Sequence, residues 1–215
     1  MKLYWIVALL LLQGCSQIYY STWEMLGKQK RDLLRDNVEN LSSDQKEVQE
    51  EVQDALTRLR TLYGSPPEKL TQVYDDLKSD YDSAKSKAAE LHARIEKVDD
   101  IAKDLFNEWD AEIGRLKTPK YKQDSRHKLQ QTKQKYAKLQ TSVRKAEKGL
   151  TPVLAALEEQ VIYLKHNLNA QALGGIKAEL RSVESEIKTL SSALQSSIEE
   201  SQSFVSTLNT DGPST

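Results

Sequence analysis

The chain has 215 residues, of which 38% are hydrophobic and 29% charged, a composition typical of a water-soluble body and not of a protein built from membrane spans. Its formal net charge of −1 argues neither for nor against an anionic partner, and its single cysteine excludes an intramolecular disulfide. Eight glycines and five prolines provide few turns, so the composition predicts long helices.

The first residues form a short apolar segment behind a positive charge. Lys2 supplies the charge, and residues 3–12 are apolar without interruption. A membrane-spanning helix needs roughly 20 apolar residues, whereas a stretch of about 10 after a basic start is typical of a secretory signal. We therefore expect residues 1–14 to be a signal peptide.

Residues 12–15 read Leu-Gln-Gly-Cys and resemble the lipobox of bacterial lipoproteins, in which a cysteine after a small residue becomes the acylated N-terminus. The resemblance implies a diacylglycerol and an N-acyl chain on Cys15, no dissociable cofactor, and a membrane-proximal segment at 15–32. Three acyl chains attach a protein effectively permanently, because each buried methylene adds ~0.8 kcal/mol of membrane affinity. Ser16, where Asp would retain the protein at the inner membrane, favours the outer membrane and a body facing the periplasm.

Apolar residues spaced alternately by four and three predict a first helix over residues 33–63. The polar Gln45 occupies one position of this seam, where it would set helix register or oligomeric state. The apolar members of the seam are Leu34, Val38, Leu41, Val48, Val52, Ala55, Leu59 and Leu62.

A second seam runs from Leu70 to Trp109 and predicts a helix over residues 66–117. Gly64 and the prolines at 66 and 67 separate it from the first helix. Ser65 and Glu68 have the spacing of a capping box. A helix of about fifty residues would be roughly 70 Å long.

The third and fourth helices are predicted over residues 119–168 and 172–208. Pro152 lies inside the third helix, where proline removes a backbone hydrogen bond, so we expect a kink there. Gly174 and Gly175 punctuate the junction before the fourth helix, and residues 209–215 read as a disordered tail. Because the connections are short, the sequence predicts an all-α, elongated, antiparallel up-down bundle or coiled coil of four long helices.

The titratable residues form no pattern that predicts catalysis or metal binding. His92, His127 and His166 stand far apart in the sequence, and each has at most one carboxylate a helical turn away. Gly174 and Gly175 lack the Lys and the Ser or Thr of a phosphate-binding loop. We therefore expect a protein without enzyme activity or a metal site. A hydrolase or metal-dependent enzyme is the remote alternative and would require the histidines to converge with carboxylates.

Basic residues heavily outnumber acidic ones from Arg115 to Lys148. Lys128, Lys133 and Lys135 are the candidates for contact with an anionic surface, either lipid headgroups or cell wall. The alternative is a solvated face that pairs with acidic helices, above all with the acidic first helix. Nucleic acid is not an expected partner, because an exported lipoprotein does not normally meet any.

The junction between the third and fourth helices is the other candidate site. Lys165, His166, Asn167 and Asn169 crowd a seam that is elsewhere apolar. Asn side chains there could cap the helix end. The alternative is a tip that docks a partner protein.

The run from Tyr163 to Ala170, with Pro152-Val-Leu and Glu108-Trp109 before it, resembles a family of Gram-negative coiled-coil envelope lipoproteins catalogued only as a domain of unknown function. The resemblance spans nearly the whole mature chain and implies an envelope location and a helical body, but no activity. We expect a membrane-tethered, non-enzymatic helical spacer or adaptor that contacts another envelope protein or a second copy of itself. A module that binds lipid or cell wall through the basic face of the third helix is the alternative.

Overall fold

The computed structural model describes residues 30–62, 65–167 and 170–210, and within these ranges the chain is helical with no strand. The helices are α3 (Lys30–Leu62), α4 (Leu70–Arg115), α5 (Pro119–His166) and α6 (Ala170–Thr210), with the short 3-10 turn η1 (Pro67–Lys69) between α3 and α4. The predicted all-α helical bundle is therefore confirmed.

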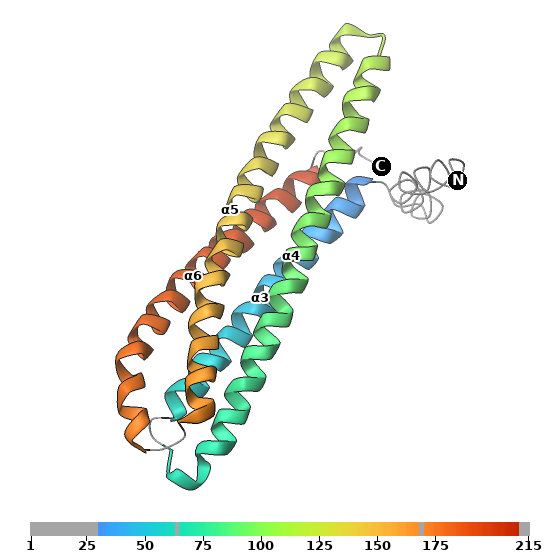
Figure 1. Cartoon of the computed structure of the whole chain (residues 1–215). Coiled ribbons are helices and arrows are strands. Elements are labelled where there is room, and N and C mark those ends of the chain that lie inside the picture. The colour runs from blue at the N-terminus through green and yellow to red at the C-terminus, as the bar shows by residue number, and fades with distance from the viewer. Residues whose placement is uncertain (1–29, 63–64, 168–169, 211–215) are drawn as a thin grey trace, which may run out of the picture.

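The four helices pack as a ring in which α3 contacts α4 and α6, and α5 contacts the same two helices. Lys30 at the start of α3 forms a 2.8 Å ion pair with Glu108 near the end of α4. Arg58 near the end of α3 instead reaches Asp80 near the start of α4, at 3.3 Å. Figure 1 shows the chain reversing direction at each of its connections. Helices α3 and α5 consequently lie diagonally across the ring.

The core is made from the seam residues and from side chains beside them. Every apolar residue of the first seam, from Leu34 to Leu62, is buried, and Gln45 is buried among them. Each helix of a ring faces two neighbours, so its buried stripe is wider than the two seam positions of a simple coiled coil. The buried residues that widen it include Leu33, Leu56, Ile101, Phe106, Ile113 and Leu129.

An aromatic cluster joins three of the helices. The ring of Tyr136 on α5 meets Phe106 of α4 edge to face, with ring centroids 5.6 Å apart. The same ring meets Phe204 of α6 at 5.5 Å, and Phe204 is 1% exposed. Aromatic pairs in these geometries add stability beyond that of the buried area, so the cluster fixes α6 against the α4–α5 pair.

The start of α4 differs from its prediction. The predicted capping box is wrong, because the Ser65 hydroxyl donates a 2.8 Å hydrogen bond to the carbonyl oxygen of Thr61 at the end of α3. Helix α4 begins after η1 with no side-chain cap. The serine thus satisfies one of the last carbonyls of the preceding helix, which otherwise lack an intrahelical donor.

The bounds of the other helices also shift. Helix α3 begins at Lys30 instead of residue 33, and α6 begins at Ala170, so Gly174 and Gly175 lie inside a helix and not at a junction. Helix α6 also continues to Thr210, into the tail predicted to be disordered from 209. A glycine costs roughly 1 kcal/mol in a helix interior, which the packing of a long apolar seam can offset. The rest of the tail lies outside the described residues.

Helix α5 continues through Pro152 without a break, and Pro152 is exposed. A proline on the solvent side keeps its ring out of the core, although it still removes one hydrogen bond from the helix. The kink expected there stays a prediction.

Candidate functional site

The α4–α5 hairpin extends past the described ends of α3 and α6, as Figure 1 shows. The ion pair of Lys30 with Glu108 marks the level at which α3 begins. On the other side, the Nζ atom of Lys135 donates a 2.9 Å hydrogen bond to the hydroxyl of Thr207, near the end of α6. Beyond Glu108, α4 continues to Arg115, which at 1.5 Å per residue is about 10 Å of further helix.

The base of this projection is held by Trp109. Its indole Nε1 donates a 2.9 Å hydrogen bond to the hydroxyl of Ser125 on α5, and the guanidinium of Arg31 lies 5.0 Å from its ring centroid. Ile113, which is 1% exposed, closes the apolar contact between the two helices. The backbone N–H of Leu116 donates to the Ile113 carbonyl at 3.2 Å and ends α4. These contacts make the projection an ordered extension of the bundle.

We call residues 114–123 the hairpin tip. It contains Arg115, Lys117, Lys120 and Lys122 and no acidic residue. All residues from 114 to 121 are exposed. In the part of the chain that the structure describes, Arg115 pairs with Glu112 at 3.7 Å and the three lysines form no ion pair. The first turn of α5 also lacks an acidic residue, so the partial positive charge of a helix N-terminus adds to that of the lysines.

Large apolar side chains are exposed at both ends of the bundle. Leu116 (36% exposed) and Tyr121 (62%) belong to the hairpin tip. Ile162 (59%) and Tyr163 (40%) lie on the last turns of α5, at the opposite end. Tyr121, Ile162 and Tyr163 fall between seam positions, which is the signal by which the sequence could have shown them, whereas Leu116 stands where the second seam would continue, seven residues after Trp109.

The three lysines predicted to contact an anionic surface do not form one face. The Nζ atom of Lys133 lies 5.7 Å from the ring centroid of Phe106 on α4, whereas Lys135 reaches Thr207 on α6. Residues two apart on a helix project about 200° apart, so these side chains take opposite flanks. Lys128 is exposed.

Among the described basic residues of α5, Arg144 forms ion pairs, one with Glu147 of its own helix at 3.1 Å and two with α4. Arg144 contacts Glu96 at 2.7 Å and Asp99 at 2.5 Å, both on α4. The acidic helix α3 pairs with α4 instead, for example through Asp44 and Arg94 at 2.9 Å. In the described residues, therefore, the basic stretch is not paired with the first helix, because α3 and α5 are diagonal.

Asp99 is the centre of a polar cluster between α4 and α5. Its carboxylate accepts hydrogen bonds from the Tyr136 hydroxyl, from Gln140 Nε2 at 3.0 Å and from Arg144. Burial, and then the hydrogen bond to Asp99, raises the pKa of the Tyr136 hydroxyl, which keeps it protonated as a donor. Each group is engaged by another member, so the cluster fastens α4 to α5.

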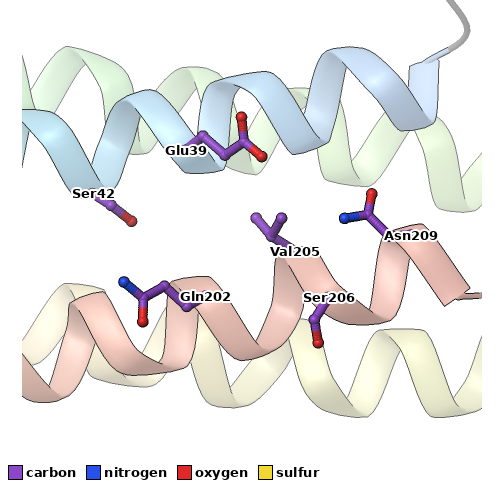
Figure 2. Close-up of a pocket in the computed structure, with 6 residues that line it drawn as sticks. All are labelled: Glu39, Ser42, Gln202, Val205, Ser206 and Asn209. Atoms are coloured by element: carbon purple, nitrogen blue, oxygen red, sulfur yellow. The ribbon is translucent and has the colours of Figure 1, made fainter.

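A hollow of about 300 Å³ lies between α3 and α6, and Figure 2 shows its lining. Glu39 and Ser42 come from α3, and α6 contributes Gln202, Val205, Ser206 and Asn209. A single carboxylate among hydroxyls and amides can accept hydrogen bonds, but the lining holds no histidine, cysteine or second acid for acid–base chemistry.

A family model described as protein of unknown function (DUF2959) matches residues 19–208. The chain belongs to this family. The match covers nearly all of the described bundle and agrees with the resemblance to an uncharacterised family inferred from the residues around Tyr163. No curated protein matches the chain. Cys15 precedes both the matched range and the described residues, so its acylation stays a prediction.

The four residues predicted to dock a partner, at the junction between α5 and α6 of this DUF2959 chain, do not share one environment. Lys165 and His166 are exposed. Asn167 is the C-cap residue of α5, and its Nδ2 atom donates a 2.9 Å hydrogen bond to the carbonyl oxygen of Tyr163. This contact supports the capping interpretation for Asn167. Asn169 lies outside the described residues.

The histidines of the DUF2959 bundle stay apart. His92 on α4 contacts Glu147 of α5 at 2.5 Å, whereas His127 and His166 are exposed near opposite ends of α5. Among the described residues, no three His, Cys, Asp or Glu side chains are grouped so that they could hold a metal ion. In the same ranges, no helix combines the length and apolarity that crossing a membrane requires.

Proposed function

We propose that this DUF2959 protein is a bacterial envelope lipoprotein, acylated on Cys15 and attached to the outer membrane with its body in the periplasm. We propose further that it acts as a non-enzymatic helical spacer or adaptor, through contacts between a helix face and another envelope protein or a second copy of itself. The lipobox-like sequence at 12–15 supports the address. The bundle supports the mode of action.

The separation between the two ends of the bundle carries the proposal. Lys30 follows Cys15 by fifteen residues and begins α3 at the end where the α4–α5 hairpin projects. Helix α3 has 33 residues, so at 1.5 Å each it is about 50 Å long. A partner bound at the far end would therefore be held about 50 Å from Lys30, where the described chain begins after the proposed lipid anchor.

The far end offers a small protein-binding surface. Ile162 and Tyr163 are exposed there beside Lys165 and His166. An apolar pair with a polar rim is the usual make-up of a protein contact, and a tyrosine adds both apolar area and a hydrogen-bonding group. We assign this surface, Ile162, Tyr163, Lys165 and His166, as the candidate partner-binding surface.

Mass spectrometry of the purified protein tests the address. The expected N-terminal peptide begins at Cys15 and carries a diacylglycerol and an N-acyl chain, and Cys15→Ala abolishes the modification. A chain that begins at Met1 without fatty acid would refute the proposed attachment.

Site-specific photocrosslinking in intact cells tests the adaptor. A photoreactive residue at Tyr163 should give a discrete product, which mass spectrometry identifies as another protein or a second copy. The same photoreactive residue at Gln134, which is exposed about a third of the way along α5, is the matched control. Equal products at both positions, or none at Tyr163, would contradict a partner-binding surface at the far end.

A further inference from the structure

We infer that the hairpin tip docks on the surface of a bilayer that contains anionic phospholipid, and so gives the anchored chain a second, electrostatic attachment. This inference rests on the proposed lipid anchor at Cys15. It also places the contact with an anionic surface at the end of the α4–α5 hairpin, instead of at Lys128, Lys133 and Lys135.

The position of the hairpin tip supports a membrane contact. The tip and the start of α3 lie at the same end of the bundle, and the tip extends beyond Lys30 (Figure 1). The fifteen residues from Cys15 to Lys30 can span at most about 50 Å when extended. An anchor at Cys15 therefore leaves the bundle close enough to the bilayer for the tip to touch it.

The charge of the hairpin tip is complementary to anionic headgroups. Lys117, Lys120 and Lys122 form no ion pair within the described part of the chain, and Lys117 and Lys120 are exposed. Docking therefore breaks no ion pair of these lysines. A basic residue near an anionic bilayer contributes about a fivefold gain in membrane affinity.

Two exposed apolar side chains favour a bilayer over a polysaccharide as the occupant. Leu116 and Tyr121 stand among the basic residues of the tip, at 36% and 62% exposure. Tyrosine concentrates at membrane interfaces, where its ring enters the apolar region and its hydroxyl stays in water. A hydrated cell-wall glycan would gain little from Leu116, which carries no charge and forms no hydrogen bond through its side chain. The hairpin tip therefore suits a bilayer, in which anionic headgroups contact the basic residues and the acyl chains contact the exposed leucine and tyrosine.

A fluorescent label at the tip of the acylated full-length protein tests the inference. Cys15 is the only cysteine and is blocked when acylated, so Thr118→Cys introduces a unique thiol. Thr118 makes no side-chain cap hydrogen bond, so the substitution spares α5. We expect nitroxide-labelled lipid to quench the label in vesicles of phosphatidylcholine with phosphatidylglycerol, and much less in phosphatidylcholine alone. A label at Lys165→Cys, at the far end, should not be quenched in either.

Charge variants test whether docking depends on the lysines of the hairpin tip and not on basic residues farther along α5. In the Thr118→Cys background, Lys117→Gln, Lys120→Gln and Lys122→Gln together should lower the ratio of docked to undocked tip by about a hundredfold, at about fivefold per lysine. The matched control replaces Lys128, Lys138 and Lys145, which lie farther along α5, with glutamine and should leave quenching unchanged. Equal quenching with and without phosphatidylglycerol, or equal loss in both triple variants, would overturn the inference. If purified peptidoglycan protects the label and nitroxide-labelled lipid does not quench it, the inference would be overturned in favour of a contact with the cell wall.

The same samples distinguish this inference from the proposed function. Mass spectrometry reports whether Cys15 is acylated, independently of the tip. If Cys15 proves unmodified, the proposed anchor fails, and flotation of the full chain with vesicles of either composition then tests the tip alone. Flotation that depends on phosphatidylglycerol and on the three lysines would support the tip, and its absence would refute it.

Discussion

Gln45 on α3 donates a 2.7 Å hydrogen bond to the hydroxyl of Ser197 on α6, and both side chains are fully buried. The Gln45 Oε1 atom is buried without a partner among the described residues. A shift of α3 along α6 would break this hydrogen bond, and an amide nitrogen left without an acceptor is unfavourable in a core. This buried contact therefore helps to set the register between the two helices, together with the 3.1 Å hydrogen bond from Gln53 of α3 to the hydroxyl of Ser191 on α6.

Ser197→Ala should destabilise the bundle, because it leaves the amide donors of Gln45 without this acceptor. We expect a loss of about 1–3 kcal/mol in the free energy of unfolding, measured by urea denaturation. Gln45→Leu with Ser197→Ala should recover most of the loss, because an apolar pair needs no partner, but light scattering should then detect mixed oligomeric states. Ser201→Ala is the control, since the hydroxyl of Ser201 donates only to the Ser197 carbonyl in its own helix. A double variant as unstable as Ser197→Ala would contradict this account.

Phe204→Ala should be among the most damaging core substitutions. It empties the site that Phe204 fills beside Tyr136, and deleting a buried phenylalanine typically costs about 3–5 kcal/mol. Tyr121→Ala, on the exposed hairpin tip, should change stability by less than about 0.5 kcal/mol. Chemical denaturation of the two variants checks the difference, and a small loss at Phe204 would show that α6 is not fastened by the aromatic cluster.

Two of the helical glycines, Gly114 and Gly149, make a matched pair. Alanine at Gly114 meets no atom within 4 Å and should stabilise α4 by about 0.5–1 kcal/mol, because glycine disfavours the helix. Alanine at Gly149 would place its Cβ 3.3 Å from Cδ1 of Leu190, so the gain there should be smaller. Thermal melting of both variants tests this order. A larger gain at Gly149 would show that the contact between α5 and α6 yields easily.

The acidic surface between α3 and α4 should make stability depend on pH. Burial, followed by the charges of Asp54 and Asp76, raises the pKa of Asp80 against the opposing effect of Arg58. Burial and the charge of Asp80 likewise raise the pKa of Glu51. A raised pKa means that the folded chain binds the proton more tightly than the unfolded chain. The contribution of Asp80 to stability therefore grows as the pH falls through this pKa and is lost above it.

Asp80→Asn removes that titration. Relative to the chain that keeps Asp80, the variant should be more stable at about pH 7, and this advantage should shrink towards about pH 4. Urea denaturation at both pH values measures the difference, with Asp124→Asn on the exposed part of α5 as the control. An advantage that grows as the pH falls would reverse the assigned sign.

The sequence by itself determined where the helices lie and which side of each is buried. The alternation from Leu34 to Leu62 is a property of neighbouring residues, because a repeat of three and a half residues places an apolar stripe on a helix in any fold. The end of α3 ahead of Pro66 and the start of α5 at Pro119 follow in the same way, from the dihedral angles that proline allows. The lipobox-like segment is equally local.

Only the tertiary structure decided which helices are neighbours and how far each extends. A seam shows that one side of a helix must be covered, but several helices can cover it equally well. Ion pairs act over a few ångströms, so the partners of Arg144 depended on α5 lying beside α4 and diagonal to α3. The exposed, basic hairpin tip likewise follows from the register at Lys30 and Glu108, which leaves α4 and α5 longer than their neighbours.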